Sequence, residues 1–164
     1  DVGRCMAADI DPTNPGLEMW SADSKGLRNV KGDILNGRVR STNFGIWWDG
    51  DLLRELLDHE RVLKYDWKAG RTYTLLQLKN CKFNNGTKSN PCLSADILGD
   101  WREEILTRDE TSSELRLYVS TIPTTHRMTC LEEDVPYRLG VAAENSGYNQ
   151  PPETGFYFGA ESKF

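Results

Sequence analysis

Short runs of apolar, aromatic and β-branched residues, separated by glycine, proline and polar turns, make up most of the chain. Such runs are typical of β-strands. No stretch shows an amphipathic pattern long enough for a helix of more than three turns. The pattern therefore predicts a mostly β protein. The clearest strand candidates are residues 43–48, 61–65, 72–78, 114–120 and 155–158.

Two segments are ambiguous, because residues 52–57 and 137–144 consist largely of residues that favour helices. An internal repeat bears on the first of them. Residues 50–57 (GDLLRELL) align without gaps to residues 99–106 (GDWREEIL). The two copies predict the same local structure at two places in the chain.

A looser third copy lies near the start of the chain, at residues 9–20. The last acidic residues of the three copies, Glu18, Glu55 and Glu104, are 37 and 49 residues apart. This spacing is close to the ~40–50 residues of a β-propeller blade. In such a repeat the acidic turn opens a strand, so we interpret residues 52–57 as β rather than helix.

The three acidic turns are candidate metal sites. Each offers two or three carboxylates beside backbone carbonyls, and calcium prefers such hard oxygen ligands in a flexible loop. None contains His or Cys, which argues against zinc. Aspartate also caps turns without any metal, but three related copies favour structural calcium sites. The candidate ligands are Asp9, Asp11, Glu18, Asp49, Asp51, Glu55, Asp96, Asp100 and Glu104.

Charge and hydropathy exclude several functions. The chain carries 20 Lys and Arg against 25 Asp and Glu, a net charge of -5, so it has no cationic excess for nucleic acid. No apolar run approaches the ~18 residues of a membrane span. We therefore expect neither nucleic acid nor membrane as a partner. Because the chain begins at Asp1 rather than Met, we expect it to be a piece of a longer protein.

The four cysteines leave two alternatives open. Cys81 and Cys92 flank the polar loop 82–91, where a disulfide would clamp the loop in an oxidising compartment. Two reduced, half-buried thiols fit the same spacing. We expect Cys5 and Cys130 to be single buried thiols.

Two polar loops are candidates for binding chemistry. Residues 84–88 (NNGTK) combine a tight Asn-Gly turn with amides, a hydroxyl and an ammonium group. Such groups can bind sugars, although a plain surface hairpin is the simpler interpretation. Tyr148 lies in a second loop, residues 145–152, where it could also be a turn tyrosine packed on prolines.

Four motifs together resemble one family. They are residues 43–51 (NFGIWWDGD), 84–88 (NNGTK), 99–104 (GDWREE) and 148–152 (YNQPP). In this order they are similar to the C-terminal part of the rhamnogalacturonan lyases of polysaccharide lyase family 11, over about residues 2–159. The resemblance implies an eight-bladed, calcium-binding β-propeller with antiparallel blades. Residues 1–164 would form roughly its last three blades, with no internal domain boundary.

The resemblance also implies a reaction and its residues. These lyases cleave the rhamnose–galacturonate backbone of pectin, rhamnogalacturonan I, by β-elimination. Lys88 matches the family's lysine and Tyr148 its tyrosine at this step, and Arg4 matches the arginine near the substrate carboxylate. Lys88 can accept a proton only in its neutral form. The residues expected to contact the sugar are Asn85, Gly86 and Thr87.

An alternative function is a calcium-stabilised β-propeller module that binds carbohydrate or serves as a scaffold without catalysis. Acidic turns alone do not separate the two functions, whereas the loop lysine and the tyrosine favour the lyase. We expect the isolated chain to be inactive and to self-associate, because an open propeller exposes sheet edges that the missing blades would cover. The resemblance implies a secreted or cell-envelope protein, extracellular or periplasmic.

Overall fold

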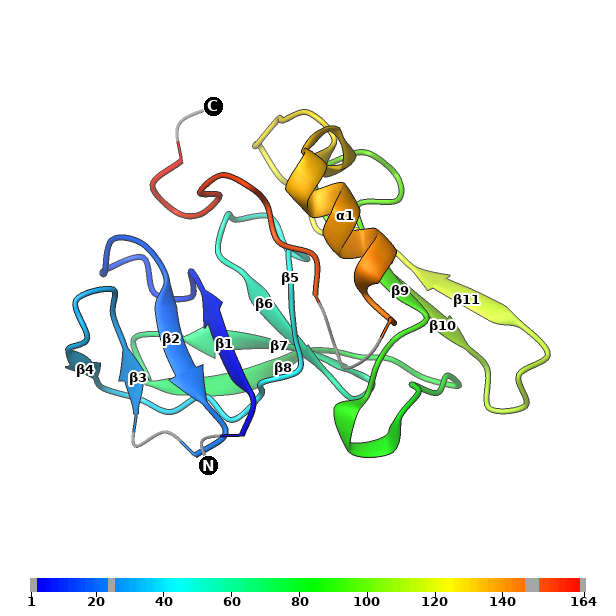
Figure 1. The fold of residues 1–164 in the computed structure, drawn as a ribbon, viewed down its shortest axis with the longest axis horizontal. Helices are drawn as coiled ribbons and strands as arrows, with labels where there is room; N and C mark the ends of the chain where they lie inside the picture. The colour runs from blue at the N-terminus through cyan, green and yellow to red at the C-terminus, as the bar shows by residue number, and fades with distance from the viewer. Residues whose placement is uncertain (1–2, 24–25, 147–150, 163–164) are drawn as a thin grey trace.

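Three antiparallel sheets follow one another along the chain in the computed structural model, which describes residues 3–23, 26–146 and 151–162 (Figure 1). The first sheet contains β1 (Cys5–Ala8), β2 (Glu18–Ser21), β3 (Leu27–Arg28) and β4 (Ile34–Leu35). The second contains β5 (Phe44–Ile46), β6 (Glu55–Asp58), β7 (Arg61–Asp66) and β8 (Arg71–Gln77). The third contains β9 (Leu93–Ala95), β10 (Glu104–Arg108) and β11 (Leu115–Tyr118).

Each sheet is a meander in which every strand pairs with the next one along the chain. Within the described part, the only α-helix is α1 (Val135–Ala143), and two 3₁₀ turns lie at Gly86–Lys88 and Leu131–Glu133. The mostly β prediction is therefore confirmed. Each acidic turn lies in the first hairpin of one sheet, and its last acid is the first residue of the second strand: Glu18, Glu55 and Glu104.

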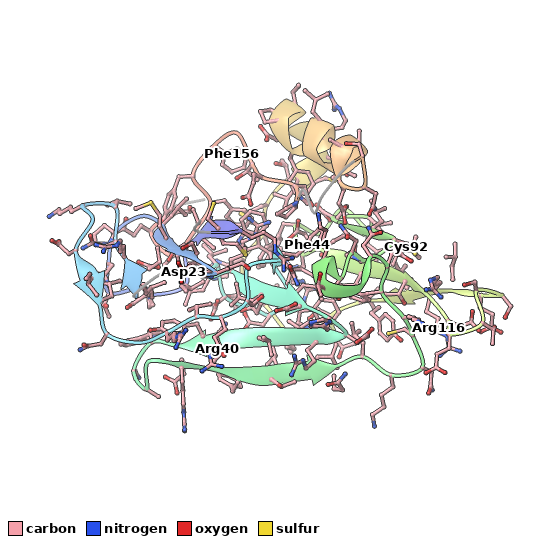
Figure 2. The ribbon with its side chains drawn as sticks, turned by 60° about the horizontal axis from the view of Figure 1, so that its bottom comes forward. Asp23, Arg40, Phe44, Cys92, Arg116 and Phe156 are labelled. Atoms are coloured by element: carbon pink, nitrogen blue, oxygen red, sulfur yellow. The ribbon has the colours of Figure 1, made fainter. Side chains whose placement is uncertain are left out.

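The second sheet is packed on both faces. Leu56 and Leu57 are neighbours in β6, so their side chains point to opposite faces, and both are fully buried. Leu56 packs with Met6, Trp20 and other side chains of the first sheet. Leu57 packs with Phe44, which lies in the middle of the molecule in Figure 2, and with Ile105 of the third sheet. Burying each leucine contributes roughly 1.5–3 kcal/mol to the stability of the fold. The second sheet is therefore packed against the first sheet on one face and the third sheet on the other.

The interpretation of the two ambiguous segments is now decided. Residues 52–57 turn and then enter β6 at Glu55, as the repeat indicated. Residues 137–144 fall mainly in α1, whose N-cap residue Asp134 accepts a hydrogen bond from the Tyr137 N–H at 3.0 Å. Helix α1 lies beside β9 (Figure 1). Helix propensity therefore predicts residues 137–144 correctly, whereas the repeat correctly overrides it at residues 52–57.

The strand predicted at residues 155–158 is wrong. This segment forms bends and irregular backbone, because its polar groups and rings have other partners. The N–H of Gly155 donates to the Asp134 carboxylate at 2.7 Å. The Phe158 ring stacks on Trp47, with ring centroids 4.6 Å apart. Phe158 packs into a third cluster of buried residues, whereas Phe156 and Tyr157 are exposed.

All four cysteines are free thiols. Cys81 is buried in the core between the second and third sheets, and Cys92 is half-buried. Cys5 is exposed and Cys130 half-buried, so the expectation that both are buried is wrong. Strand β1 alternates exposed and buried side chains, and Cys5 falls on its exposed face. None of the described helices has the length and apolar composition that crossing a membrane requires.

Candidate functional site

The polar loop at residues 84–90 connects β8 to β9 and is held by its own hydrogen bonds. The backbones of Asn84 and Asn90 exchange two hydrogen bonds, of 2.7 and 3.0 Å, across its base. The Asn85 side chain donates to the Asn90 carbonyl oxygen Oδ1 at 2.9 Å. Asn85 and Gly86 have φ of 60° and 52°, the left-handed region that Asn and Gly adopt most easily. The Asn-Gly pair thus produces the tight turn before Lys88.

This turn presents the predicted sugar-contacting residues to solvent. Asn85, Gly86 and Thr87 are exposed, whereas Lys88 is half-buried. A rigid loop with exposed amide, backbone and hydroxyl groups suits a polyhydroxy ligand, because each group can exchange water for a sugar hydroxyl without reorganising.

Arg4, which precedes β1, reaches this loop from the other end of the chain. Its guanidinium donates to the Thr87 carbonyl at 3.2 Å and to the side-chain oxygen of Asn43. Asn43 in turn donates to the Asp58 carboxylate. The structure therefore brings together Arg4 and the loop, which are more than 80 residues apart. The sequence motifs singled out neither Asn43 nor Asp58 as a support for Arg4.

A groove of about 550 Å³ adjoins Arg4 and Asn43. Its lining also includes Pro151 and Glu153 of the C-terminal segment, which passes between the first sheet and helix α1 (Figure 1). The third predicted catalytic residue, Tyr148, lies outside the described residues.

In all three acidic turns the last glutamate closes the turn. A carboxylate oxygen of Glu18 accepts hydrogen bonds from the N–H groups of Ile10 and Asp11, both at 3.0 Å. Glu55 does the same for Trp48 and Asp49, at 3.0 and 3.1 Å, and Glu104 accepts from Leu98 at 2.9 Å. These glutamates are buried. The repeat is therefore a turn motif that is closed by its own hydrogen bonds, with or without a metal ion.

The second acidic turn gathers three carboxylates, those of Asp49, Asp51 and Glu55. One ligand atom of each lies within 4.8 Å of the others, a grouping that could hold a metal ion. The Lys64 ammonium pairs with all three, at 2.7 Å from Asp51 and 2.8 Å from Glu55. Burial opposes the charge on Lys64, but the carboxylates prevail and raise its pKa above the ordinary value.

The first acidic turn lacks such a basic partner. Among the described residues, no Lys, Arg or His pairs with Asp9, Asp11 or Glu18. One oxygen of Asp9 (Oδ1) and one of Glu18 (Oε1) are buried and have no hydrogen-bond partner among the residues that the structure describes. Burial raises the pKa of Glu18 to about 7.

The third acidic turn is held by backbone donors and one arginine. The Asp96 carboxylate accepts from the N–H groups of Asp100 and Trp101, at 2.9 and 3.1 Å. Arg102 pairs with Asp100 at 2.6 Å. The nine predicted ligands thus form three turns with different partners, and the structure does not bring the turns together into one site.

A buried junction links the second and third turns to the C-terminal segment. Arg54 is 3% exposed and donates to the carbonyls of Pro152, at 2.9 Å, and Gly45, at 3.2 Å. It also pairs with the Glu153 carboxylate, and its guanidinium lies over the Trp47 ring, 4.2 Å from the centroid.

Glu103 completes this Arg54 junction. Its carboxylate lies 3.8 Å from Arg54 and accepts hydrogen bonds of 2.8 Å from the Trp47 N–H and from the Tyr137 hydroxyl. Sequence reasoning missed the junction, although a signal was present. Arg54 and Glu103 occupy the same position in the two aligned repeats, and opposite charges at equivalent positions can pair when the repeats pack together.

Three sheets that each repeat the same acidic hairpin, together with an exposed polar loop that Arg4 contacts, define a β-repeat protein with a surface suited to a polar ligand. The family model described as rhamnogalacturonan lyase family 11, C-terminal domain, matches residues 1–163. The chain belongs to this family.

Known relatives agree with that assignment. Rhamnogalacturonan endolyase YesW of Bacillus subtilis (strain 168) is 55% identical over 160 residues, which are 97% of this chain and 26% of that protein. Rhamnogalacturonan exolyase YesX of the same organism is 46% identical over 179 residues, 99% of this chain and 29% of that protein. The solved structure of Bacillus licheniformis rhamnogalacturonan lyase PL11 has a TM-score of 0.95 at 55% identity, covering 99% of this chain and 28% of that one. The chain thus spans between a quarter and three tenths of these relatives.

Proposed function

We propose that this chain supplies part of the substrate site of a rhamnogalacturonan lyase, which cleaves the rhamnose–galacturonate bond of rhamnogalacturonan I by β-elimination. The observation that carries the proposal is the contact between Arg4 and the Thr87 carbonyl. That contact places a guanidinium next to the turn that carries Lys88, beside an open groove. The family assignment supports the same chemistry.

The reaction needs a cation, a base and an acid around one galacturonate. Arg4 would pair with the substrate carboxylate and stabilise the negative charge that develops as the C5–H bond breaks. Lys88 would accept that proton, the C4–C5 double bond would form, and the C4–O4 bond would break. Tyr148 would protonate the departing rhamnose oxygen. The exposed groups of Asn85, Gly86 and Thr87 would hold the sugar ring in place for these steps.

Calcium is proposed as a structural ion of the first and third acidic turns. At the first turn, one buried oxygen each of Asp9 and Glu18 has no partner in the part of the chain that the structure describes, and this supports calcium because buried carboxylate oxygens without donors are costly. Carboxylate and backbone oxygens are also the ligands that calcium prefers. Asp9, Asp11 and Glu18 would hold the ion, which would neutralise charge and stiffen the hairpin between β1 and β2. The third turn, with Asp96, Asp100 and Glu104, is a weaker candidate because Arg102 already pairs with Asp100.

The partners proposed for the chain are the polysaccharide and the preceding part of a propeller. Met19 and Ile34, on the first sheet, are 39% and 61% exposed. Preceding blades, or a second copy of the chain, would cover such side chains. Because the substrate is a polymer, we propose that the protein acts as a secreted or cell-envelope enzyme.

The test uses the chain joined to the region that precedes it in full-length family 11 lyases. Lys88→Ala should lower kcat by at least about 10³-fold, followed as the ultraviolet absorbance of the unsaturated product formed from rhamnogalacturonan. Its melting temperature should stay close to that of the wild type, because Lys88 lies on a surface turn.

Lys82→Ala is the matched control, since Lys82 is exposed and only six residues away. The control should keep wild-type turnover. Near-normal turnover of Lys88→Ala would refute the assignment. An inactive wild type that still binds the polysaccharide would favour the alternative, a carbohydrate-binding module without catalysis.

A further inference from the structure

The second acidic turn has no carboxylate oxygen left without a donor. Three of its six oxygens accept from Lys64, one on each of Asp49, Asp51 and Glu55. The other three accept from the backbone: Asp49 from the Asp51 N–H at 2.9 Å, Asp51 from the Leu53 N–H at 2.9 Å, and Glu55 from the N–H groups of Trp48 and Asp49. Every carboxylate oxygen of this turn therefore has at least one donor.

The position of Lys64 follows from the strand register. Leu56 of β6 pairs with Leu63 of β7 in an antiparallel register. Glu55, one residue before Leu56, therefore lies across from Lys64, one residue after Leu63. Facing residues on neighbouring strands are close enough for their side chains to pair. Lys64 is therefore placed against the turn by the sheet itself, and its side chain is only 14% exposed.

The same register position carries no cation in the other two sheets. Met19 pairs with Arg28 in the first sheet, which places Asn29 across from Glu18. Ile105 pairs with Tyr118 in the third sheet, which places Val119 across from Glu104. The first turn, across from Asn29, is the one with buried oxygens that lack a partner among the described residues.

We propose that Lys64 is the built-in cation of the second acidic turn and occupies the place that a divalent cation would take there. The three carboxylates of this turn then bind a metal ion only when the lysine side chain is removed. The inference does not depend on lyase activity.

The two cations exclude each other on geometric grounds. Calcium binds carboxylate oxygens at about 2.3–2.6 Å and takes six to eight oxygen ligands. The oxygens available to it here are those that Lys64 contacts at 2.7 and 2.8 Å. An ion bound to them would share its position with the ammonium, and the remaining carboxylate oxygens face backbone N–H groups, which repel a cation.

The first test is Lys64→Met, which keeps most of the side-chain length and removes the charge. Calcium titration calorimetry should show one more bound ion for this variant than for the wild type. Calcium should also raise its melting temperature by about 3 °C or more beyond any wild-type rise. Lys68→Met, at an exposed lysine of the next turn, removes the same charge and should behave as the wild type. Equal ion numbers and equal calcium responses in all three proteins would overturn the proposal.

A second measurement needs no variant and therefore remains valid if Lys64→Met does not fold. Wild-type protein is acetylated briefly in 2 mM calcium or in chelator, and the lysines are quantified by mass spectrometry. Lys64 should react at least ~10-fold more slowly than Lys68 in both conditions, because its ammonium stays paired. Equal labelling of Lys64 and Lys68, or calcium-induced exposure of Lys64, would overturn the proposal.

Discussion

The loop at residues 84–90 and the Arg54 junction are both built from polar groups, but these groups are exposed in the loop and buried at the junction. Asn85, Gly86 and Thr87 of the loop are exposed, and hydrogen bonds within the loop hold its conformation. The junction buries Arg54 and Glu103 and satisfies them with neighbours from several segments. The groups that we propose contact a ligand are exposed to water, whereas the groups that join segments are buried. Mutations should therefore affect ligand chemistry in the loop and stability at the junction.

The largest effect on stability is expected from Arg54→Met. The change leaves the buried Glu103 carboxylate without its positive partner and the Pro152 carbonyl without its donor, which should lower the free energy of unfolding by about 3–5 kcal/mol. Urea denaturation measures this loss. Arg116→Met, at the third-sheet edge in Figure 2, removes a more exposed ion pair with Glu114 and should cost less than ~1 kcal/mol. Similar losses in both variants would mean that the junction is not a special link.

A smaller effect, of opposite sign, is expected from Glu144→Gln. Burial raises the pKa of Glu144 to about 8 from its ordinary 4.5. Between these values the folded chain holds the proton more tightly than the unfolded chain, so stability falls as the pH rises. Gln removes this loss and keeps an oxygen for the Ser94 N–H, which Glu144 accepts at 3.0 Å.

Glu144→Gln should therefore match the wild type near pH 4.5 and be more stable by on the order of 2 kcal/mol at pH 8.5. Urea denaturation across this pH range measures the difference. The exposed Glu133→Gln variant should follow the wild-type curve. A wild-type stability that does not fall from pH 5 to 8 would contradict the prediction.

The smallest effect on stability is expected from Thr87→Ala in the loop. Arg4 contacts the backbone carbonyl of Thr87, so removing the exposed side chain should change the free energy of unfolding by less than ~0.5 kcal/mol. In the extended lyase the same change should raise KM several-fold, because the hydroxyl that we propose contacts the sugar is lost. A large drop in melting temperature with unchanged KM would show that Thr87 is structural.

Much of the fold follows from local patterns. Strands β5, β7, β8 and β11 lie where short runs of apolar, aromatic and β-branched residues predict them, and the repeat places β6 correctly against its helical propensity. The prediction at residues 155–158 failed because β-branched and aromatic composition reports burial as much as pairing. Phe158 is buried and stacks on Trp47, and it lies outside the strands of the described residues.

The sequence by itself determined the acidic turns, the Asn-Gly loop and the family, because these are carried by residues close together in the chain. Only the tertiary structure decided which groups that are far apart in the chain come into contact. Arg4 reaches Thr87, and Lys64 closes one acidic turn while another has two buried oxygens with no partner among the described residues. Arg54 joins Glu103 to the C-terminal segment. Such contacts depend on strand register and sheet packing, and a shift of one residue along a strand would abolish them.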